Sequence, residues 1–220
     1  MPRLPLLVVP GYPHHITQRG VRSIDIFSND DDRHAYLQFM SDEAKRFGVS
    51  FLGWCLMTNH IHLIAVPEHE DSLARAIGEA HRRYTRKKNF ASGVRGYLFQ
   101  GRFSSCVMDE EHLLVAGRYV ERNPVAAKMT KTPQEHLWSS CRFHCGLSDR
   151  DLLVSDPVLP SLVDDWKKFL QSADDKSEKS LKSKTRTGRP AGGGEFVTRL
   201  EVMTGRELRL KTPGRKRREK

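Results

Sequence analysis

The order of strand-like and helical segments in the first 123 residues restricts the fold of this chain more than any other feature. Four segments are apolar or alternating and bounded by turn residues, and they predict strands at 14–20, 49–57, 60–66 and 98–108. Three others have capping residues and apolar side chains at helical spacing, and they predict helices at 32–47, 71–84 and 110–123. The last of these is predicted to end before Pro124. The order is therefore strand, helix, two strands, helix, strand, helix.

That order is typical of a split β-α-β arrangement, in which an antiparallel sheet carries helices on one face. We therefore predict an α+β fold with a ferredoxin-like core, in which the apolar strand at 60–66 is central. Beyond residue 145 the pattern is less regular. It predicts a short amphipathic helix at 157–171, a polar linker at 172–194 and one more helix at 195–210.

The positive charge of the chain is concentrated at its C-terminal end. The net charge is +10, from 37 basic and 27 acidic residues. Residues 176–220 hold 15 basic and 5 acidic residues, whereas residues 1–175 hold 22 of each. This distribution indicates a neutral body with a tail that binds a polyanion, for which nucleic acid is the first choice. A solvated tail without function is the alternative.

Neither cysteine content nor hydropathy points to secretion or to a membrane. Cys55 and Cys106 lie in apolar runs and are expected to be small buried hydrophobes. The stretch CRFHC (141–145) lacks a second ligand pair at zinc-finger spacing. No run approaches the roughly 20 apolar residues that a membrane span needs. We therefore expect a cytoplasmic protein that does not associate with membranes.

Two histidines interrupt the apolar strand at 60–66. Strand side chains alternate between faces, so His60 and His62 share a face, with their α-carbons roughly 6.5–7 Å apart. Two imidazoles in this position can reach one metal ion. The alternative is a pair of hydrogen-bonded core histidines. The choice depends on a third ligand and a nucleophile.

The last predicted helix carries Tyr119 and Asn123, four residues apart and therefore on one face. Leu113, Ala116 and Val120 form the apolar stripe that would hold this helix against the sheet. Tyr119 lies at the edge of that stripe. Spacing alone favours a packing role for Tyr119 and a helix-end cap for Asn123.

The histidine strand and the tyrosine helix carry short motifs that occur together in one family. They are LMTNHIHLIAVP (56–67), YVERNPVAA (119–127), WSS (138–140), HHITQRG (14–20) and QGRF (100–103). Together they resemble the single-tyrosine HUH transposases, and most closely the REP-associated branch of the IS200-like transposases, over roughly residues 10–145. Residues 187–210 resemble the tails of longer members. Thr58 stands where members often have proline, and CRFHC is not typical of the family.

The resemblance implies a site and a reaction. His60 and His62 would bind a divalent cation, with Asn123 as third ligand, and this mixed donor set suits Mg²⁺ or Mn²⁺. Tyr119 would attack a phosphodiester of single-stranded or REP-like hairpin DNA, giving a 5′-phosphotyrosine and a free 3′-hydroxyl. The covalent intermediate would keep the bond energy for rejoining, so the protein would be an endonuclease and strand transferase. Members act as monomers or homodimers, and either state is expected here.

The resemblance and the charge distribution together predict three parts. Residues 1–145 would form the HUH single-tyrosine transposase domain. Residues 146–175 would form a short helical extension, and residues 176–220 a basic linker and DNA-binding tail.

Substrate affinity is predicted to come from cationic side chains that contact phosphates. The predicted DNA-binding residues are Arg82, Arg83, Arg86, Lys87, Lys88, Arg102, Arg118 and Arg122. Tyr84, within RRYTRKK, would stack on an unpaired base. It is also a rival nucleophile, disfavoured because the residue four positions on is lysine. A solvated helix face is the alternative for RRYTRKK.

Two other functions compete with the transposase hypothesis. A non-catalytic DNA-binding protein would show salt-dependent binding without a covalent product. A phosphodiesterase that activates metal-bound water would cleave without Tyr119.

Overall fold

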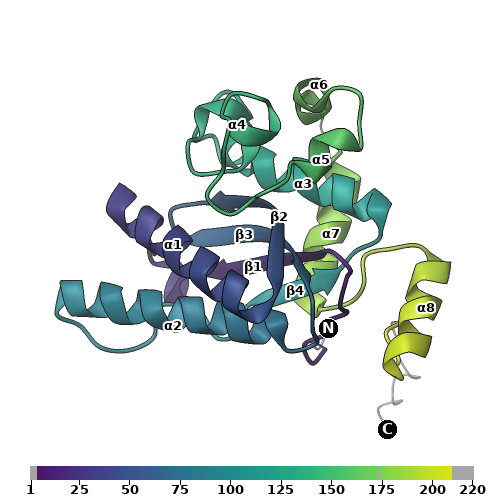
Figure 1. Cartoon of the computed structure of the whole chain (residues 1–220), viewed down its shortest axis with the longest axis horizontal. Coiled ribbons are helices and arrows are strands. Elements are labelled where there is room, and N and C mark those ends of the chain that lie inside the picture. Colours follow the sequence, from purple (N-terminus) through teal and green to yellow (C-terminus); the bar gives the residue numbers. More distant parts are fainter. Residues whose placement is uncertain (1–3, 173, 210–220) are drawn as a thin grey trace, which may run out of the picture.

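A computed structural model describes residues 4–172 and 174–209 of the chain and shows a four-stranded sheet flanked by helices (Figure 1). The strands are β1 (His14–Arg19), β2 (Val49–Leu56), β3 (His60–Pro67) and β4 (Ser104–Val107). Their order in the sheet is β2-β3-β1-β4, and all three pairings are antiparallel. The predicted α+β, ferredoxin-like core and the central place of the histidine strand are therefore confirmed.

Helices cover both faces of this sheet (Figure 1). The two helices of the split β-α-β unit, α1 (Asp30–Phe47) and α2 (Ser72–Ser92), lie together on one face as predicted. A third helix, α3 (Glu110–Ala126), adds a layer on the other face. Side chains of β3 alternate between the two layers: Leu63 packs with α1 and α2, whereas Ile64 packs with α3.

Local signals set the ends of the first two helices. The Asn29 side chain accepts a hydrogen bond from the Asp32 amide at 2.9 Å and caps α1. Gly48 ends α1 in the left-handed region, at a φ of 63°. Helix α2 runs eight residues beyond the predicted end at residue 84 and stops at Gly93. Its second half is polar on its outer side, so apolar spacing did not reveal it.

Two predicted boundaries differ from the structure. Helix α3 continues to Ala126 and contains Pro124, so the prediction that it ends before the proline was wrong. The proline lies in the last turn, where the Asn123 carbonyl still accepts from the Ala127 amide at 2.9 Å. The strand predicted over 98–108 is regular only in β4, because Gly101 adopts a φ of 61° and interrupts it.

The segment predicted as a linker at 172–194 instead contains helix α7 (Asp175–Thr187), which packs against β4 and α3. The Asp174 side chain caps it by accepting from the Ser177 amide at 3.0 Å. Leu181 and Thr185 are buried on its inner face, although the rest of the helix is polar. This packing, rather than composition, makes the segment helical.

The remaining C-terminal elements are short. The helix predicted over 157–171 is two helices, α5 (Val158–Ser161) and α6 (Trp166–Gln171). The predicted last helix is α8 (Gly194–Thr204). The basic end PGRKRREK (213–220) lies outside the described residues. No helix among residues 4–172 and 174–209 combines the length and apolarity that a membrane span requires.

The CRFHC stretch forms the short helix α4 (Cys141–His144) and takes part in packing. The His144 Nδ1 lies 2.5 Å from a carboxylate oxygen of Glu121, and both side chains are buried. The Trp166 indole donates to the other Glu121 oxygen at 2.8 Å. The buried Glu121 carboxylate, satisfied in this way, holds α3, α4 and α6 together.

Tyr84 is a core residue. Its side chain is fully buried, and its hydroxyl donates to the Ile26 carbonyl at 2.5 Å. The prediction that it stacks on DNA was therefore wrong, because α2 turns this residue inward. Its burial agrees with the preference for Tyr119 over Tyr84 as nucleophile.

Acid should destabilise the fold through the buried His14. Burial lowers the pKa of His14 to about 4, and the neutral ring accepts from the Val9 amide while its Nδ1 donates to the Tyr12 carbonyl. The unfolded chain therefore binds a proton below about pH 6.5 that the folded protein excludes. We expect this residue to reduce the free energy of unfolding by up to about 1.4 kcal/mol per pH unit as pH falls toward 4.

Urea unfolding at about pH 7.5 and about pH 5 measures this loss. His14→Gln keeps a donor and an acceptor without titrating, so it should flatten the pH dependence. The matched change at exposed His69 should leave the pH dependence of the unfolding free energy as in the wild type. An identical pH dependence in the wild type and both variants would contradict the role given to His14.

Candidate active site

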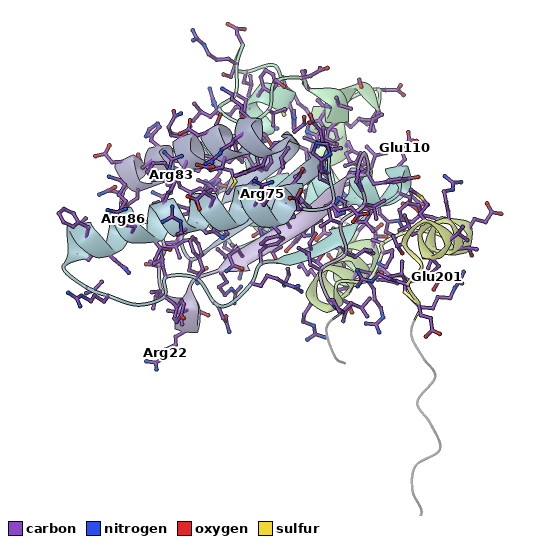
Figure 2. The ribbon with its side chains drawn as sticks, turned by 60° about the horizontal axis from the view of Figure 1, so that its bottom comes forward. Arg22, Arg75, Arg83, Arg86, Glu110 and Glu201 are labelled. Carbon is purple, nitrogen blue, oxygen red and sulfur yellow. The ribbon has the colours of Figure 1, made fainter. Side chains whose placement is uncertain are left out.

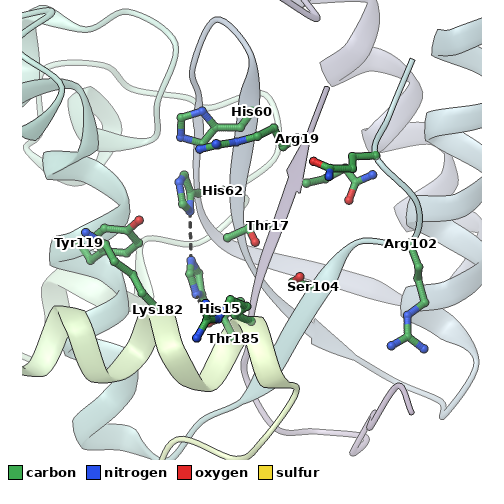
Figure 3. Close-up of a pocket in the computed structure, with 13 residues that line it drawn as sticks. His15, Thr17, Arg19, His60, His62, Arg102, Ser104, Tyr119, Lys182 and Thr185 are labelled. Carbon is green, nitrogen blue, oxygen red and sulfur yellow. Dashed lines mark hydrogen bonds between the residues drawn. The ribbon is translucent and has the colours of Figure 1, made fainter. Parts of the chain in front are cut away.

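The two predicted metal-binding histidines and the predicted nucleophile line one cavity of about 700 Å³ on the α3 face of the sheet (Figure 3). Strands β1 and β3 supply one wall, α3 supplies Tyr119, and α7 supplies Lys182. The strand register places these side chains next to one another in the wall, because Thr17 pairs with His62 and Arg19 pairs with His60. All four of these side chains line the cavity.

His60 and His62 stand side by side, with ring centroids 5.1 Å apart and ring planes at 79°. Burial lowers the pKa of His60 to about 4, assisted by the nearby Arg19 charge. Burial also places the pKa of His62 well below its ordinary value. Both rings are therefore neutral at physiological pH, which is the form that binds a metal ion.

Asn123 lies against both histidines. Its amide nitrogen is 3.2 Å from His62 Nε2, and its side chain also interacts with His60, which partly offsets the lowering of the His60 pKa. One turn of α3 separates Asn123 from Tyr119, and a hydrogen bond between the two side chains opposes the effect of burial on the phenol. The predicted set of four residues is thus brought together by the structure.

The Tyr119 ring packs edge-on against His62, with centroids 5.2 Å apart, and is largely buried. Burial raises the pKa of this phenol to about 12, although Arg19 acts in the opposite direction. The Lys182 ammonium lies 4.7 Å from the ring centroid. The phenol is therefore protonated at neutral pH, because burial outweighs the opposing effects of Asn123 and Arg19.

A chain of hydrogen bonds determines which His62 nitrogen is free. The Thr185 hydroxyl donates to the Leu181 carbonyl at 2.9 Å, so it accepts from His15 Nδ1 at 2.8 Å. His15 Nε2 then lacks a proton and accepts from His62 Nδ1 at 3.2 Å, the dashed contact in Figure 3. His62 Nε2 is left with a lone pair that faces Asn123.

The donor set fits a divalent cation. Within the described ranges, no group of three or more His, Cys, Asp or Glu side chains forms a metal site. A cation at this site would need the Asn123 amide oxygen in addition to the two imidazoles. The oxygen and nitrogen of an asparagine amide can exchange positions according to their hydrogen-bond partners. A 180° rotation of the Asn123 amide would place its oxygen beside the His62 lone pair. Two nitrogens and one oxygen leave room for phosphate and water.

The predicted DNA-binding residues are scattered. Arg102 lines the cavity, at the end away from Tyr119 (Figure 3). Residues 82–88 belong to α2, on the opposite side of the sheet. Arg83 lies between α1 and α2 and pairs with Glu43 at 2.7 Å (Figure 2). These contacts do not decide whether the residues of this segment bind DNA, and that role stays a prediction.

The other members of the predicted set make different contacts. Arg82 pairs with Glu79 at 2.5 Å and Lys88 pairs with Asp32, whereas Arg86 and Lys87 are exposed. The two arginines beside the nucleophile also have partners in the chain. Arg118 donates to the Ser172 hydroxyl at 3.0 Å, and Arg122 donates to the Leu170 carbonyl. Both therefore tie α3 to the segment that contains α6.

Several cavity residues were missed in the sequence. The alternation of HHITQRG carried a signal for His15, Thr17 and Arg19, which share the face of the metal-site pair across β1 and β3. Lys182 and Thr185 gave no signal, because their segment was interpreted as a linker.

Comparisons with known proteins identify the family and the fold of the chain. The sequence model of the family described as Transposase IS200 like matches residues 10–123, more than half of the chain. The structure of the REP-associated tyrosine transposase bound to a REP hairpin matches with a TM-score of 0.57 at 15% identity, over 71% of this chain and 93% of that one. That likeness shows a shared fold.

A second solved structure, of a candidate transposase from Deinococcus radiodurans, has a TM-score of 0.39 at 16% identity and covers 52% of this chain and 92% of that one. No curated protein sequence matches the chain. The family match shows that this chain belongs to the IS200-like transposase family.

Proposed function

We propose that the protein cleaves and rejoins single-stranded DNA through a 5′-phosphotyrosine at Tyr119, beside a divalent cation held by His60, His62 and Asn123. The observation that carries this proposal is the packing of the Tyr119 ring against His62, while Asn123 reaches both histidines. One phosphate can then contact the phenol and the cation together. The solved relative bound to a REP hairpin makes hairpin DNA the proposed substrate.

In the proposed reaction, the Tyr119 oxygen forms a bond to phosphorus and the 3′-oxygen leaves, taking a proton to become a hydroxyl. Attack by a 3′-hydroxyl on the phosphotyrosine reverses these changes and releases the phenol. A bound Mg²⁺ or Mn²⁺ would stabilise charge on the non-bridging oxygens. Arg19 favours loss of the phenol proton, since its positive charge lowers the pKa of Tyr119.

The C-terminal segment contributes to the proposed DNA surface. Lys182 and Arg186 of α7 line the cavity and can contact phosphates. We therefore keep residues 1–145 as the catalytic body, 146–175 as a helical extension and 176–220 as a DNA-contacting part. Part of the last segment is packed helix rather than linker. Monomeric and homodimeric forms both fit this proposal.

Covalent-product formation tests the function directly. A labelled REP-like hairpin with single-stranded flanks is incubated with protein and Mg²⁺, Mn²⁺ or EDTA and separated on a denaturing gel. A metal-dependent band of protein joined to DNA is expected. Cleavage without that band would favour attack by water, and binding without cleavage would favour the non-catalytic alternative.

Thr185→Val should weaken cation binding although Thr185 does not touch the cation site. Valine keeps the shape but removes the acceptor for His15 Nδ1, so the tautomer of His62 is no longer fixed. Loss of a partner that orients a metal-binding histidine typically costs about 10–100-fold in metal affinity. Calorimetric titration with Mn²⁺ measures this loss, and ¹⁵N NMR of the apo-protein reports the tautomer.

Thr187→Val is the matched control. Thr187 is also a buried threonine of α7, but its hydroxyl donates only to carbonyls of the same helix, Ser183 at 2.9 Å and Lys184 at 3.2 Å. Its Mn²⁺ affinity should equal that of the wild type. Equal losses in both variants would mean that α7 affects the site only through helix stability.

A further inference from the structure

A second cavity, of about 540 Å³, lies between α2 and residues 96–103. Its walls are mainly apolar and aromatic, and they include Leu98, Phe99 and Phe103. The His81 ring stacks on Phe99 with centroids 4.1 Å apart and an interplanar angle of 24°. Tyr97 also lines the cavity, with 90% of its surface exposed. A flat aromatic wall and an exposed tyrosine thus border the same space.

Residues 96–103 separate this cavity from the active site. Gln100 and Ser104 line the active-site cavity, whereas Phe99 and Phe103 line the second. Arg102 lines both. The segment is held to β1 because the Gln100 amide donates to the Arg19 carbonyl at 2.8 Å. A DNA strand that leaves the active site past Arg102 therefore needs to cross only this segment to reach the second cavity.

The rim of the second cavity carries three arginines. Arg82 and Arg86 of α2 line it, in addition to Arg102, and Arg82 also pairs with Glu79. Gly78 of α2 leaves the wall open, since a β-carbon at this position would meet no atom within 4 Å. Aromatic surface for a base and guanidinium groups for its phosphates are the two elements of single-strand recognition. An apolar peptide would offer no anionic group for the arginines to bind.

We propose that this second cavity binds an unpaired base of the DNA strand whose phosphate lies at Tyr119, with Tyr97 stacking on the base. This inference rests on the proposed function for the nature of the ligand. It also gives three of the predicted DNA-binding residues, Arg82, Arg86 and Arg102, a common place of action. The stacking role first predicted for Tyr84 passes to Tyr97.

Photocrosslinking tests the contact without cleavage. Tyr119→Phe protein is mixed with a REP-like hairpin that carries 5-iodouracil at one flank position at a time, irradiated, and mapped by mass spectrometry. Cross-links to Tyr97 from one position or two adjacent positions are expected. Phe90 is the internal control, because it is equally exposed at 90% but does not line the cavity. Cross-links only to residues outside 96–103 would overturn the proposal.

Binding measurements give an independent readout. Tyr97→Ala should weaken hairpin binding by about 5–20-fold without changing the salt dependence, since stacking on one base involves no counterion release. Phe90→Ala should change affinity less than about twofold. Arg86→Ala should lower the slope of log affinity against log salt by about 1. Wild-type affinity in Tyr97→Ala would overturn the proposal.

The outcomes separate this inference from the proposed function. A protein that forms the covalent product but shows no contact at Tyr97 contradicts the second cavity alone. A protein that cross-links at Tyr97 but forms no covalent product contradicts the tyrosine mechanism and retains the base contact.

Discussion

Tyr119→Phe should eliminate the covalent protein–DNA product and slow strand cleavage by at least about 10⁴-fold, a loss typical of removing a nucleophile. The substitution removes only the phenol oxygen. The ring contacts with His62 and His15 are those of an aromatic ring that phenylalanine also supplies. Folding and DNA binding should therefore persist. Denaturing gels measure the product, and fluorescence anisotropy confirms that the variant still binds the hairpin.

Tyr84→Phe is the matched control for this experiment. It also removes one buried phenol oxygen, here the donor to the Ile26 carbonyl, on the opposite side of the sheet. It should lower the free energy of unfolding by about 1 kcal/mol and leave the covalent product unchanged. If Tyr119→Phe still cleaved DNA, water would be the attacking group. If a fully folded Tyr84→Phe protein lost cleavage, Tyr84 would be the nucleophile.

His60→Ala and His62→Ala should each weaken Mn²⁺ binding by more than about 100-fold, beyond the effect of an indirect partner. Each removes one of two imidazoles whose neutral form is maintained by burial, and Asn123 alone is a weak ligand. Calorimetry on the apo-proteins measures the affinity, and the covalent-product assay measures the consequence. Removal of the cation with EDTA should reproduce the loss of product in the wild type.

The control for folding is thermal unfolding of each variant without metal. His69→Ala, at an exposed position outside the cavity, should bind Mn²⁺ as the wild type does. Undiminished affinity in both His60 and His62 variants would remove the metal-site hypothesis while leaving the family assignment intact.

Short-range periodicity placed the residues of the candidate site on shared faces, whereas their roles were inferred from the family resemblance. Strand alternation placed His60 and His62 on one face, and helical spacing placed Tyr119 and Asn123 on another. The sheet order then brought the two pairs together, since β3 is central and α3 crosses its face. Each of these steps depends on short-range periodicity, which a sequence shows directly.

What could not be predicted depends on long-range packing. Helix α7 looks like a linker because it buries few side chains, including Leu181 and Thr185, and it is stabilised by β4 and α3. Arg118 and Arg122 look available to DNA, but their partners lie about fifty residues further along the chain, in Ser172 and Leu170. A sequence does not show which distant carbonyl or hydroxyl a flexible cation will meet.

The hydrogen bond between His15 and Thr185 joins residues 170 positions apart. A ribosome must therefore release most of the chain before the proposed metal-binding tautomer of His62 is fixed. A growing or prematurely terminated polypeptide that ends before α7 has the tyrosine and both histidines but lacks this support. On the proposed function, the supported cation site therefore forms only after α7 has been synthesised.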